Sequence, residues 1–213
     1  MNKSEKISFF IKNLEIMFPN AKCELDFETP FQLLRAVIMS AQTTDKQVNK
    51  ISPNLFKEIS LSSDVEKVGL EKIEKYIKKI GLYRNKSRFI FESGKKINSE
   101  FNGLVPDNIK ELQTLPGVGI KTAKVVMAVL YNGPYLAVDT HVHRVLNRLG
   151  FVHTKSREQT DKKAEILFSD SDKSRLHHLL IFFGRYHCTS RNPKCETCPF
   201  TNICKYYKTN IMK

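Results

Sequence analysis

Apolar residues recur at helical spacing along almost the whole of the 213-residue chain. In the first segment, residues 5–18, they recur every three or four positions and would line one face of a helix. These positions are Ile7, Phe10, Ile11, Leu14 and Met17. The sequence contains no convincing strand-like alternation, no internal repeat and no low-complexity linker. It therefore predicts an all-α protein.

Residues that begin and end helices divide this pattern into segments. A threonine followed by Pro30 is typical of an N-cap and a first helical position, and Ser63 is predicted to begin a capping box. Gly81 and Gly150 are predicted to terminate helices in the left-handed conformation that glycine adopts at low cost. Pro53 lies inside a helical pattern, where it is expected to kink or end the helix.

The chain is strongly basic, with 35 lysines and arginines against 22 aspartates and glutamates and a net charge of +13. This charge favours a polyanionic partner, nucleic acid first, although a lysine-rich composition of the source genome would explain it as well. No apolar run approaches the roughly 18–20 residues of a membrane span. The N-terminus carries no secretory signal, so we expect an intracellular protein without a membrane partner.

The segment 115–123, LPGVGIKTA, combines a tight turn with the start of a helix. Gly117 and Gly119 permit backbone conformations and close approaches that other residues resist. Unpaired N–H groups at the start of the helix can bind an anion, and Lys121 lies in the first turn. The same pattern is also compatible with an ordinary interhelical turn and a solvated lysine.

Four of the five cysteines lie close together near the end of the sequence, with the spacing C-x6-C-x2-C-x5-C. They are Cys188, Cys195, Cys198 and Cys204. In an intracellular chain such clustering favours a metal site over disulfides. Four cysteines suit both zinc and an iron–sulfur cluster. Zinc sites usually contain two close pairs, whereas only Cys195 and Cys198 form one here, which favours the cluster modestly.

Taken together, these motifs resemble the helix-hairpin-helix DNA glycosylases, and the cysteine spacing is similar to the cluster loop of their endonuclease III group. The resemblance covers the whole chain. Besides LPGVGIKTA it includes Ser40-Ala41-Gln42, IGLY at 80–83, AVDTH at 137–141 and GRYHC at 184–188.

The resemblance implies a two-domain helical body with DNA across the cleft between the domains. Residues 24–136 would form a six-helix domain, with the helix-hairpin-helix at about 107–132. Residues 1–23 together with 137–213 would form a helical cluster domain. Its loop 188–204 would hold one 4Fe–4S cluster on the four cysteines. We expect a cytoplasmic, nucleoid-associated monomer.

The resemblance also implies a base-excision repair activity with two steps. Lys121 would displace an oxidised or ring-damaged pyrimidine at the sugar C1′ and form an imine. β-Elimination would then cleave the abasic site 3′ to the sugar, which makes the protein a glycosylase and an abasic-site lyase. Asp139 resembles the catalytic carboxylate, and it also suits the N-cap of the helix that begins at residue 140.

Further positions match the DNA contacts of this family. Gln42 and Leu82 would fill the gap that an extruded nucleotide leaves, although a leucine after a helix-ending glycine is often only packing. The amides of Gly117, Val118 and Gly119 would hold the phosphate backbone of double-stranded DNA that contains damaged pyrimidines or abasic sites.

Two alternatives remain at this point. One is a monofunctional adenine-type glycosylase, a branch that lacks the lysine at position 121. The other is a non-catalytic DNA-binding iron–sulfur protein, which would need neither Lys121 nor Asp139. One departure from the family pattern is Gln113, because some relatives have a glutamate there; an amide in its place would affect rate or pH optimum rather than the class of reaction.

Overall fold

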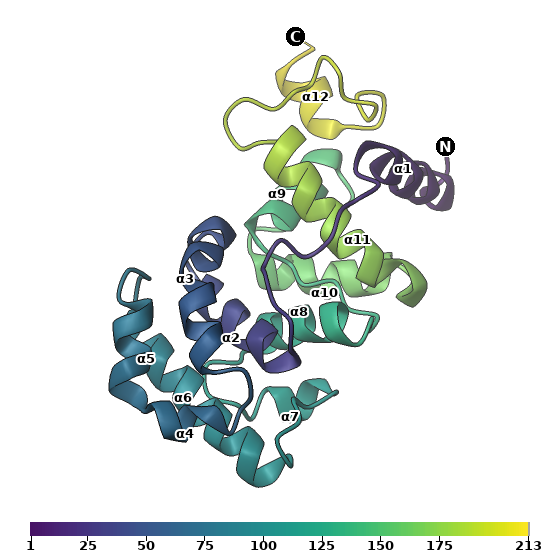
Figure 1. Cartoon of the computed structure of the whole chain (residues 1–213). Helices are drawn as coiled ribbons and strands as arrows, with labels where there is room; N and C mark the ends of the chain where they lie inside the picture. The colour runs from purple at the N-terminus through teal and green to yellow at the C-terminus, as the bar shows by residue number, and fades with distance from the viewer. Residues whose placement is uncertain (213) are drawn as a thin grey trace. The chain divides into compact units, whose positions relative to one another are not determined.

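The computed structural model describes residues 1–212, and every regular element within them is a helix (Figure 1). The all-α prediction is confirmed. No helix in this described part is long and apolar enough to cross a membrane. The chain divides into two compact units: unit 1 comprises Met1–Lys22 with Gly133–Lys213, and unit 2 comprises Cys23–Asn132. The resemblance predicted domain boundaries after residues 23 and 136, and the two units of the structure meet after residues 22 and 132.

Unit 2 is a continuous stretch of chain that contains seven helices. They are α2 (Pro30–Ser40), α3 (Asp45–Glu58), α4 (Asp64–Val68), α5 (Leu70–Ile77), α6 (Tyr83–Glu100), α7 (Ile109–Leu112) and α8 (Ile120–Leu130). Helix α2 forms the centre of this unit, because it is buried from Phe31 to Met39 and packs against α3, α6 and α8. Its start is as predicted, with Thr29 as N-cap and Pro30 at the first helical position.

Three details of unit 2 differ from the sequence prediction. Helix α3 continues through Pro53 to Glu58, so of the two expected outcomes Pro53 does not end the helix, whose buried face packs against its neighbours. Ser63 makes no capping bond; the carboxylate of Asp64 instead accepts from the amides of the preceding turn. The left-handed residue before α6 is Leu82, with φ of 59°, and not Gly81.

Unit 1 is assembled from both ends of the chain. Its elements are α1 (Lys3–Met17), α9 (Thr140–Leu149), α10 (Arg157–Leu167), α11 (Asp170–Phe182), a π-helical turn η1 (Phe183–His187) and α12 (Lys205–Asn210). Helix α9 packs against α10, α11, η1 and α12, and α1 packs against α11. Gly150 ends α9 in the left-handed conformation, as predicted.

The core of unit 1 is rich in phenylalanine. The ring of Phe10 in α1 lies 5.0 Å from those of Phe151 and Phe200. Phe200 in turn lies 5.3 Å from Phe183, where η1 begins. In η1 the amide of Cys188 donates to the carbonyl of Phe183, five residues earlier (2.7 Å). This wide turn and the aromatic packing fix the start of the cysteine-bearing segment.

Candidate functional site

The turn between α7 and α8 is built by residues of unit 2 alone. Gly117 has a φ of +79°, and a Cβ on it would lie 2.7 Å from the ring of Phe89. Only glycine therefore fits this position without strain. The Ser93 hydroxyl donates to the Pro116 carbonyl (2.8 Å) and ties the turn to α6. These interactions form the turn before any ligand arrives.

The backbone N–H groups of this turn differ in whether they can donate a hydrogen bond to a ligand. Val118 is buried, and its N–H already donates to the Leu115 carbonyl (3.1 Å). The expectation that the Val118 amide contacts phosphate is therefore revised. Gly119 is the N-cap of α8 and has no side-chain cap, and nothing in the described chain lies within 4 Å of where its Cβ would be. The amides at the start of α8 are open to an anion.

Lys121 lies in the first turn of α8, two residues after the open Gly119, and its side chain is exposed. Asp139 belongs to unit 1, where it is the N-cap of α9. One of its oxygens, Oδ1, accepts from the amides of His141 and Val142, both at 2.8 Å. The predicted capping role is confirmed. Because both bonds end on Oδ1, Oδ2 is left to accept a proton or stabilise a positive charge.

Gln42 and Leu82 share an unusual backbone conformation. Their φ angles are 56° and 59°, and they are two of only four non-glycine residues with positive φ within residues 1–212. Leu82 is also 59% exposed, and Gln42 is exposed in the turn between α2 and α3. The left-handed region costs a non-glycine residue about 1–2 kcal/mol, and such residues concentrate at functional sites.

Lys86, in the first turn of α6, lies between these two turns and was not identified from the sequence. It is only 3% exposed. Its Nζ donates three hydrogen bonds, which end on Met39 O (2.9 Å), Ala41 O (2.6 Å) and Thr43 Oγ1 (3.0 Å). Burial lowers the pKa of Lys86 below its usual value. The signal that could have revealed it is its helical spacing from the buried Ile90 and Ile97.

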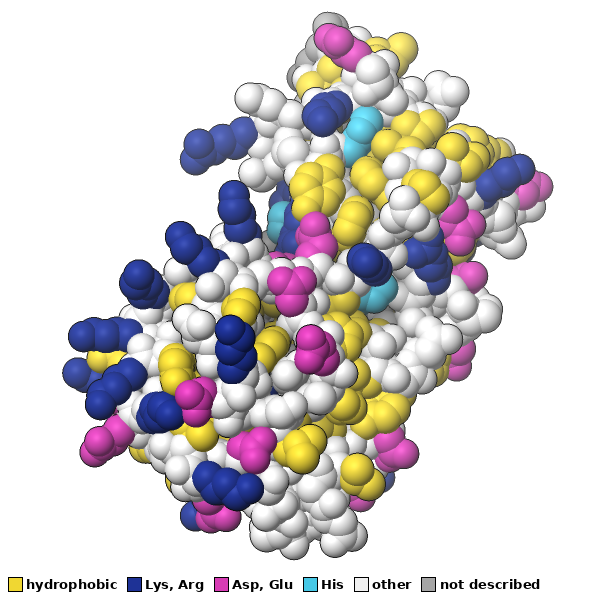
Figure 2. Space-filling model, viewed as in Figure 1, with side chains coloured by type: hydrophobic (Ala, Val, Ile, Leu, Met, Phe, Trp, Pro, Cys, Tyr) yellow, Lys and Arg dark blue, Asp and Glu magenta, His cyan; other side chains and the backbone are white. Residues whose placement is uncertain are grey.

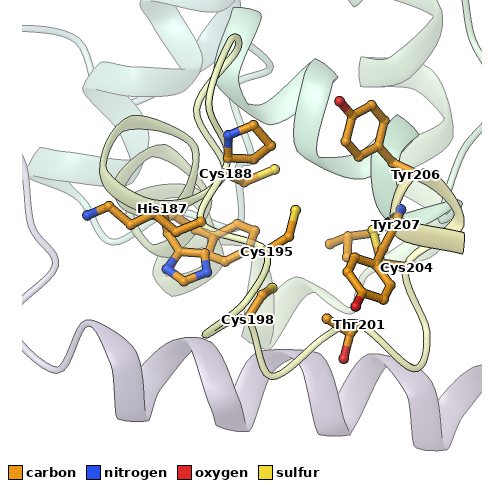
Figure 3. A pocket seen from close by; sticks show the side chains of 12 residues that line it. His187, Cys188, Cys195, Cys198, Thr201, Cys204, Tyr206 and Tyr207 are labelled. Carbon is orange, nitrogen blue, oxygen red and sulfur yellow. Dashed lines mark hydrogen bonds between the residues drawn. The ribbon is translucent and has the colours of Figure 1, made fainter. Parts of the chain in front are cut away.

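The segment 188–204, here called the cysteine loop, brings the four predicted cysteines to one cavity of unit 1. Besides the cysteines, Leu149, Phe183, Tyr206 and Tyr207 line this cavity. Figure 3 shows Cys188, Cys195 and Cys198 on one side of it, with Cys204 and Tyr207 opposite. Within the described residues, none of the four cysteines takes part in a disulfide. Residues up to 16 positions apart in sequence thus present sulfur atoms to the same space.

Two arginines of α9 hold the beginning of the cysteine loop. Arg148 donates to the carbonyls of Thr189 (2.6 Å) and Ser190 (2.7 Å). Its guanidinium lies 4.4 Å from the centre of the Tyr206 ring. Arg144 donates to the carbonyl of Cys188 (3.1 Å). These bonds satisfy carbonyls that no regular element pairs, and they place two positive charges beside the sulfur atoms.

Burial raises the pKa values of three of the four thiols, those of Cys195, Cys198 and Cys204. Burial raises the pKa of Cys198 to about 11, with a further contribution from the other three sulfurs. Burial, followed by the neighbouring cysteines, also raises the pKa of Cys195. Metal binding requires thiolates, so positively charged iron would have to compensate for their mutual repulsion.

Four cysteine sulfurs that line one cavity are a donor set suited to a metal centre. Zinc sites usually contain two close pairs of ligands, whereas only Cys195 and Cys198 form such a pair in this loop. The donor set therefore fits an iron–sulfur cluster.

Exposed lysines also form a basic edge on unit 2. They belong to α3 and α5 and are Lys46, Lys50, Lys57 and Lys75, whereas Lys72 of α5 is paired with Glu58 (2.9 Å). Figure 2 shows Lys and Arg side chains gathered where Figure 1 draws these helices. Such a surface attracts a polyanion without reading its sequence.

Comparison with known proteins identifies the family. Residues 36–169 match the family described as HhH-GPD superfamily base excision DNA repair protein, and residues 188–204 match the iron–sulfur binding domain of endonuclease III. The chain is 44% identical to Endonuclease III of Bacillus subtilis (strain 168) over 94% of its own length and 92% of that protein. The chain belongs to the endonuclease III family.

Solved structures of this endonuclease III family agree with the computed fold. One is a non-covalent Endonuclease III–DNA complex, which is 42% identical, has a TM-score of 0.92 and is matched over 100% of both chains. Another is a trapped Endonuclease III–DNA covalent intermediate in an estranged-adenine complex, with 42% identity, a TM-score of 0.90 and 98% coverage of both chains. The match over 188–204 indicates an iron–sulfur cluster in this member of the family as well.

Proposed function

We propose that this endonuclease III family member is a monomeric, bifunctional enzyme of base excision repair that acts on DNA in the nucleoid. It removes oxidised or ring-damaged pyrimidines from double-stranded DNA and then cleaves the abasic site. The observation that carries this proposal is the exposed lysine in the first turn of α8, beside the N-cap residue Gly119, which has no side-chain cap. Relatives have been solved with DNA, one of them as a trapped covalent intermediate.

The hairpin binds the DNA backbone. The amides of Gly117, Gly119 and the first turn of α8 receive a phosphate, and the helix N-terminus favours its negative charge. The lysines of α3 and α5 add long-range attraction. Phosphate contacts position the DNA without reading its sequence, and the affinity falls steeply with salt. The enzyme can therefore bind damage in any sequence context.

Gln42 and Leu82 fill the gap that the extruded nucleotide leaves. Extrusion costs a few kcal/mol of base stacking, and inserted side chains offset part of that cost. Both residues are exposed and lie on turns, and their left-handed conformations are defined by the surrounding backbone. These features suit side chains that must enter the duplex in a fixed direction.

Lys121 and Asp139 carry the excision step. The neutral amine of Lys121 attacks C1′, an Nζ–C1′ bond forms, and the C1′–N bond to the damaged base breaks. The base leaves with the bonding electron pair and takes up a proton. Oδ2 of Asp139 accepts the proton that the amine loses and stabilises the positive charge that develops on the sugar.

The lyase step uses the same lysine. Opening of the sugar ring converts the C1′ adduct into an imine, which acidifies the protons at C2′. Removal of one C2′ proton forms the C2′–C3′ double bond and expels the 3′ phosphate. Water then hydrolyses the imine and releases Lys121. The excision and lyase steps together break the C1′–N bond, the C1′–O4′ ring bond and the C3′–O bond to the phosphate, and no external oxidant or reductant is consumed.

One 4Fe–4S cluster is held by Cys188, Cys195, Cys198 and Cys204. When bound, the cluster supplies positive charge and covalent links between distant parts of the cysteine loop, and it can carry an electron. The residues of the chain itself orient the loop, with Arg144 and Arg148 on its carbonyls. In this arrangement the loop is a structural element, and neither the excision step nor the elimination passes through it.

Borohydride trapping tests the proposal. The protein is incubated with a duplex that contains an abasic site in the presence of borohydride, which reduces an imine to a stable amine. We expect a covalent protein–DNA adduct with the wild type and none with Lys121→Ala. Lys110→Ala is the matched control, because Lys110 is another exposed lysine of the same hairpin. It should retain the adduct.

Asp139→Asn separates the two roles of that residue. An asparagine Oδ1 can still accept from the amides of His141 and Val142, so the unfolding free energy should change by less than about 1 kcal/mol. Excision should nevertheless fall by at least about 100-fold, the usual contribution of a positioned acid or base. Absence of both adduct and strand cleavage with the folded wild type would overturn the proposed function.

A further inference from the structure

The three acceptors of Lys86 lie on both sides of Gln42. Met39 and Ala41 precede it and contribute carbonyls from the end of α2, and Thr43 follows it and contributes a hydroxyl. An ammonium group has three protons, and here each one has an acceptor. The positive charge also lies at the C-terminus of α2, the end of a helix that favours a cation. Lys86 therefore fixes the backbone that carries Gln42.

The same residue is also bonded to the turn that carries Leu82. Its backbone N–H donates to the Leu82 carbonyl (3.1 Å) in the first turn of α6. Leu82 is the N-cap of α6, and its side chain makes no capping bond. One residue thus contacts the Gln42 turn through its side chain and the Leu82 turn through its main chain. Both turns belong to unit 2.

Burial of this lysine is unfavourable unless its three bonds are made. It is 3% exposed, its three bonds end on neutral oxygen atoms, and burial lowers its pKa. A charged group in such a place is costly, and so are carbonyls that lose their donor. Left-handed residues such as Gln42 and Leu82 persist only where neighbouring structure imposes the conformation. Lys86 is the neighbour that the two turns have in common.

We infer that Lys86 is a positioning residue, which holds Gln42 and Leu82 at a fixed separation and orientation for insertion into the gap in the DNA. It contacts neither the DNA nor the reacting atoms. The inference rests on the proposed function, because it requires Gln42 and Leu82 to fill that gap. It predicts that Lys86 contributes to recognition of damage and not to general affinity for DNA.

The test compares binding to two duplexes, one with a stable abasic-site analogue and one undamaged. Lys86→Met keeps the length of the side chain but removes its three donors. We expect the preference for the abasic duplex to fall roughly tenfold, because buried carbonyls are left unpaired. Affinity for the undamaged duplex should stay within about twofold, since the phosphate contacts are intact. Lys95→Met, an exposed lysine of the same helix, is the matched control and should leave the preference unchanged.

Combining Lys86→Met with substitutions at Gln42 and Leu82 tests whether Lys86 acts by positioning these two residues or has a general structural role. The double variant Gln42→Ala with Leu82→Ala should lose the preference, and adding Lys86→Met should then lower it no further. Thr43→Val removes a single acceptor and should give a smaller loss in the same direction, so it keeps the test decisive if Lys86→Met fails to fold.

Three results would overturn the inference, and they differ in whether the proposed function survives. If the double variant lowers the preference while Lys86→Met and Thr43→Val leave it unchanged, Lys86 has no positioning role but the proposed function stands. The same holds if Lys86→Met has an equal effect with and without the double variant. If the double variant itself keeps the full preference, the gap-filling roles fail, and the role of Lys86 fails with them.

Discussion

The turn before α8 in unit 2 and the cysteine loop in unit 1 are both irregular segments, but different interactions hold them. In the turn, Gly117 takes a conformation natural to glycine, and Phe89 and Ser93 of α6 pack against it. The loop is held by arginine side chains that reach its carbonyls. Its sulfur atoms additionally need a cofactor.

This difference implies that the two segments form at different stages. The turn is complete as soon as unit 2 folds, because all of its partners belong to the chain. In the cysteine loop, burial raises the pKa values of Cys195 and Cys198, which opposes formation of their thiolates until iron is bound. Unit 2 should therefore tolerate loss of the cofactor, and unit 1 should not.

Removing a cluster ligand should have the largest effect. Cys198→Ser is expected to abolish the visible absorbance of the iron–sulfur cluster and to destabilise unit 1 by several kcal/mol, on the order of the folding energy that structural metals provide. Amide hydrogen exchange would resolve the effect by unit: protection should fall in α9–α12 and persist in α2–α8. Cys23→Ser, outside the loop, is the control and should keep the absorbance. Equal loss of protection in both units would contradict the comparison.

The two glycines of the turn before α8 should respond differently to alanine. Gly117→Ala forces a left-handed alanine against the Phe89 ring, so the unfolding free energy should fall by roughly 2–4 kcal/mol. Gly119→Ala meets no neighbour and should cost no more than about 1 kcal/mol, the difference between glycine and alanine at an N-cap.

Gly119→Ala should nevertheless weaken binding to undamaged DNA, because its methyl group would occupy the space through which a phosphate approaches. Denaturant unfolding and a salt titration of DNA binding measure the two effects. Unchanged stability in Gly117→Ala would show that the turn is less rigid than its geometry indicates.

Mild acid should lower the stability of unit 1 more than that of unit 2, and this effect should be smaller than those of the substitutions above. All six histidines of the chain lie in unit 1. Burial, assisted by nearby arginines, holds the pKa values of His141 and His178 below the usual 6.5. The unfolded chain therefore binds more protons below pH 6.5, and unit 1 should lose stability as the pH falls from 7 to 5.5.

Unit 2 should keep its stability over the same interval, as measured by amide exchange corrected for the intrinsic rate at each pH. A variant with His141→Gln and His178→Gln should show a smaller change in unit 1. The cluster absorbance, recorded in parallel, would reveal any loss of iron at the lower pH. A parallel decline of both units would argue against a histidine origin.

The sequence was most informative where a residue acts through its own local chemistry. Pro30 began a helix and Gly150 ended one as predicted, since their backbone preferences act whatever surrounds them. Gly81 shows the limit of this reasoning. Glycine permits the left-handed conformation but does not require it, and the packing of α6 imposes that conformation on Leu82 instead.

The same distinction between local chemistry and long-range packing applies to the candidate site. The cysteine spacing indicated a shared metal centre because sulfur chemistry limits the alternatives, and the structure brings these side chains to one cavity. Lys86 was missed because a lysine in a basic sequence suggests a solvated side chain. Its burial depends on Met39 and Ala41, more than 40 positions away in the sequence. The helical spacing of Lys86 from Ile90 and Ile97 could have indicated its burial, but neither pattern nor composition identifies the partners of its side chain.

The packing of Phe10 on Phe200 has a consequence for synthesis of the protein. At 5–20 residues per second, the ribosome makes these two residues roughly 10–40 s apart. Unit 2 is a continuous segment and is synthesised completely during that interval. Until Phe200 has been synthesised, the apolar face of α1 lacks this packing partner. Helix α1 is thus synthesised well before its packing partner Phe200, and during this period its apolar face would be a target for chaperones.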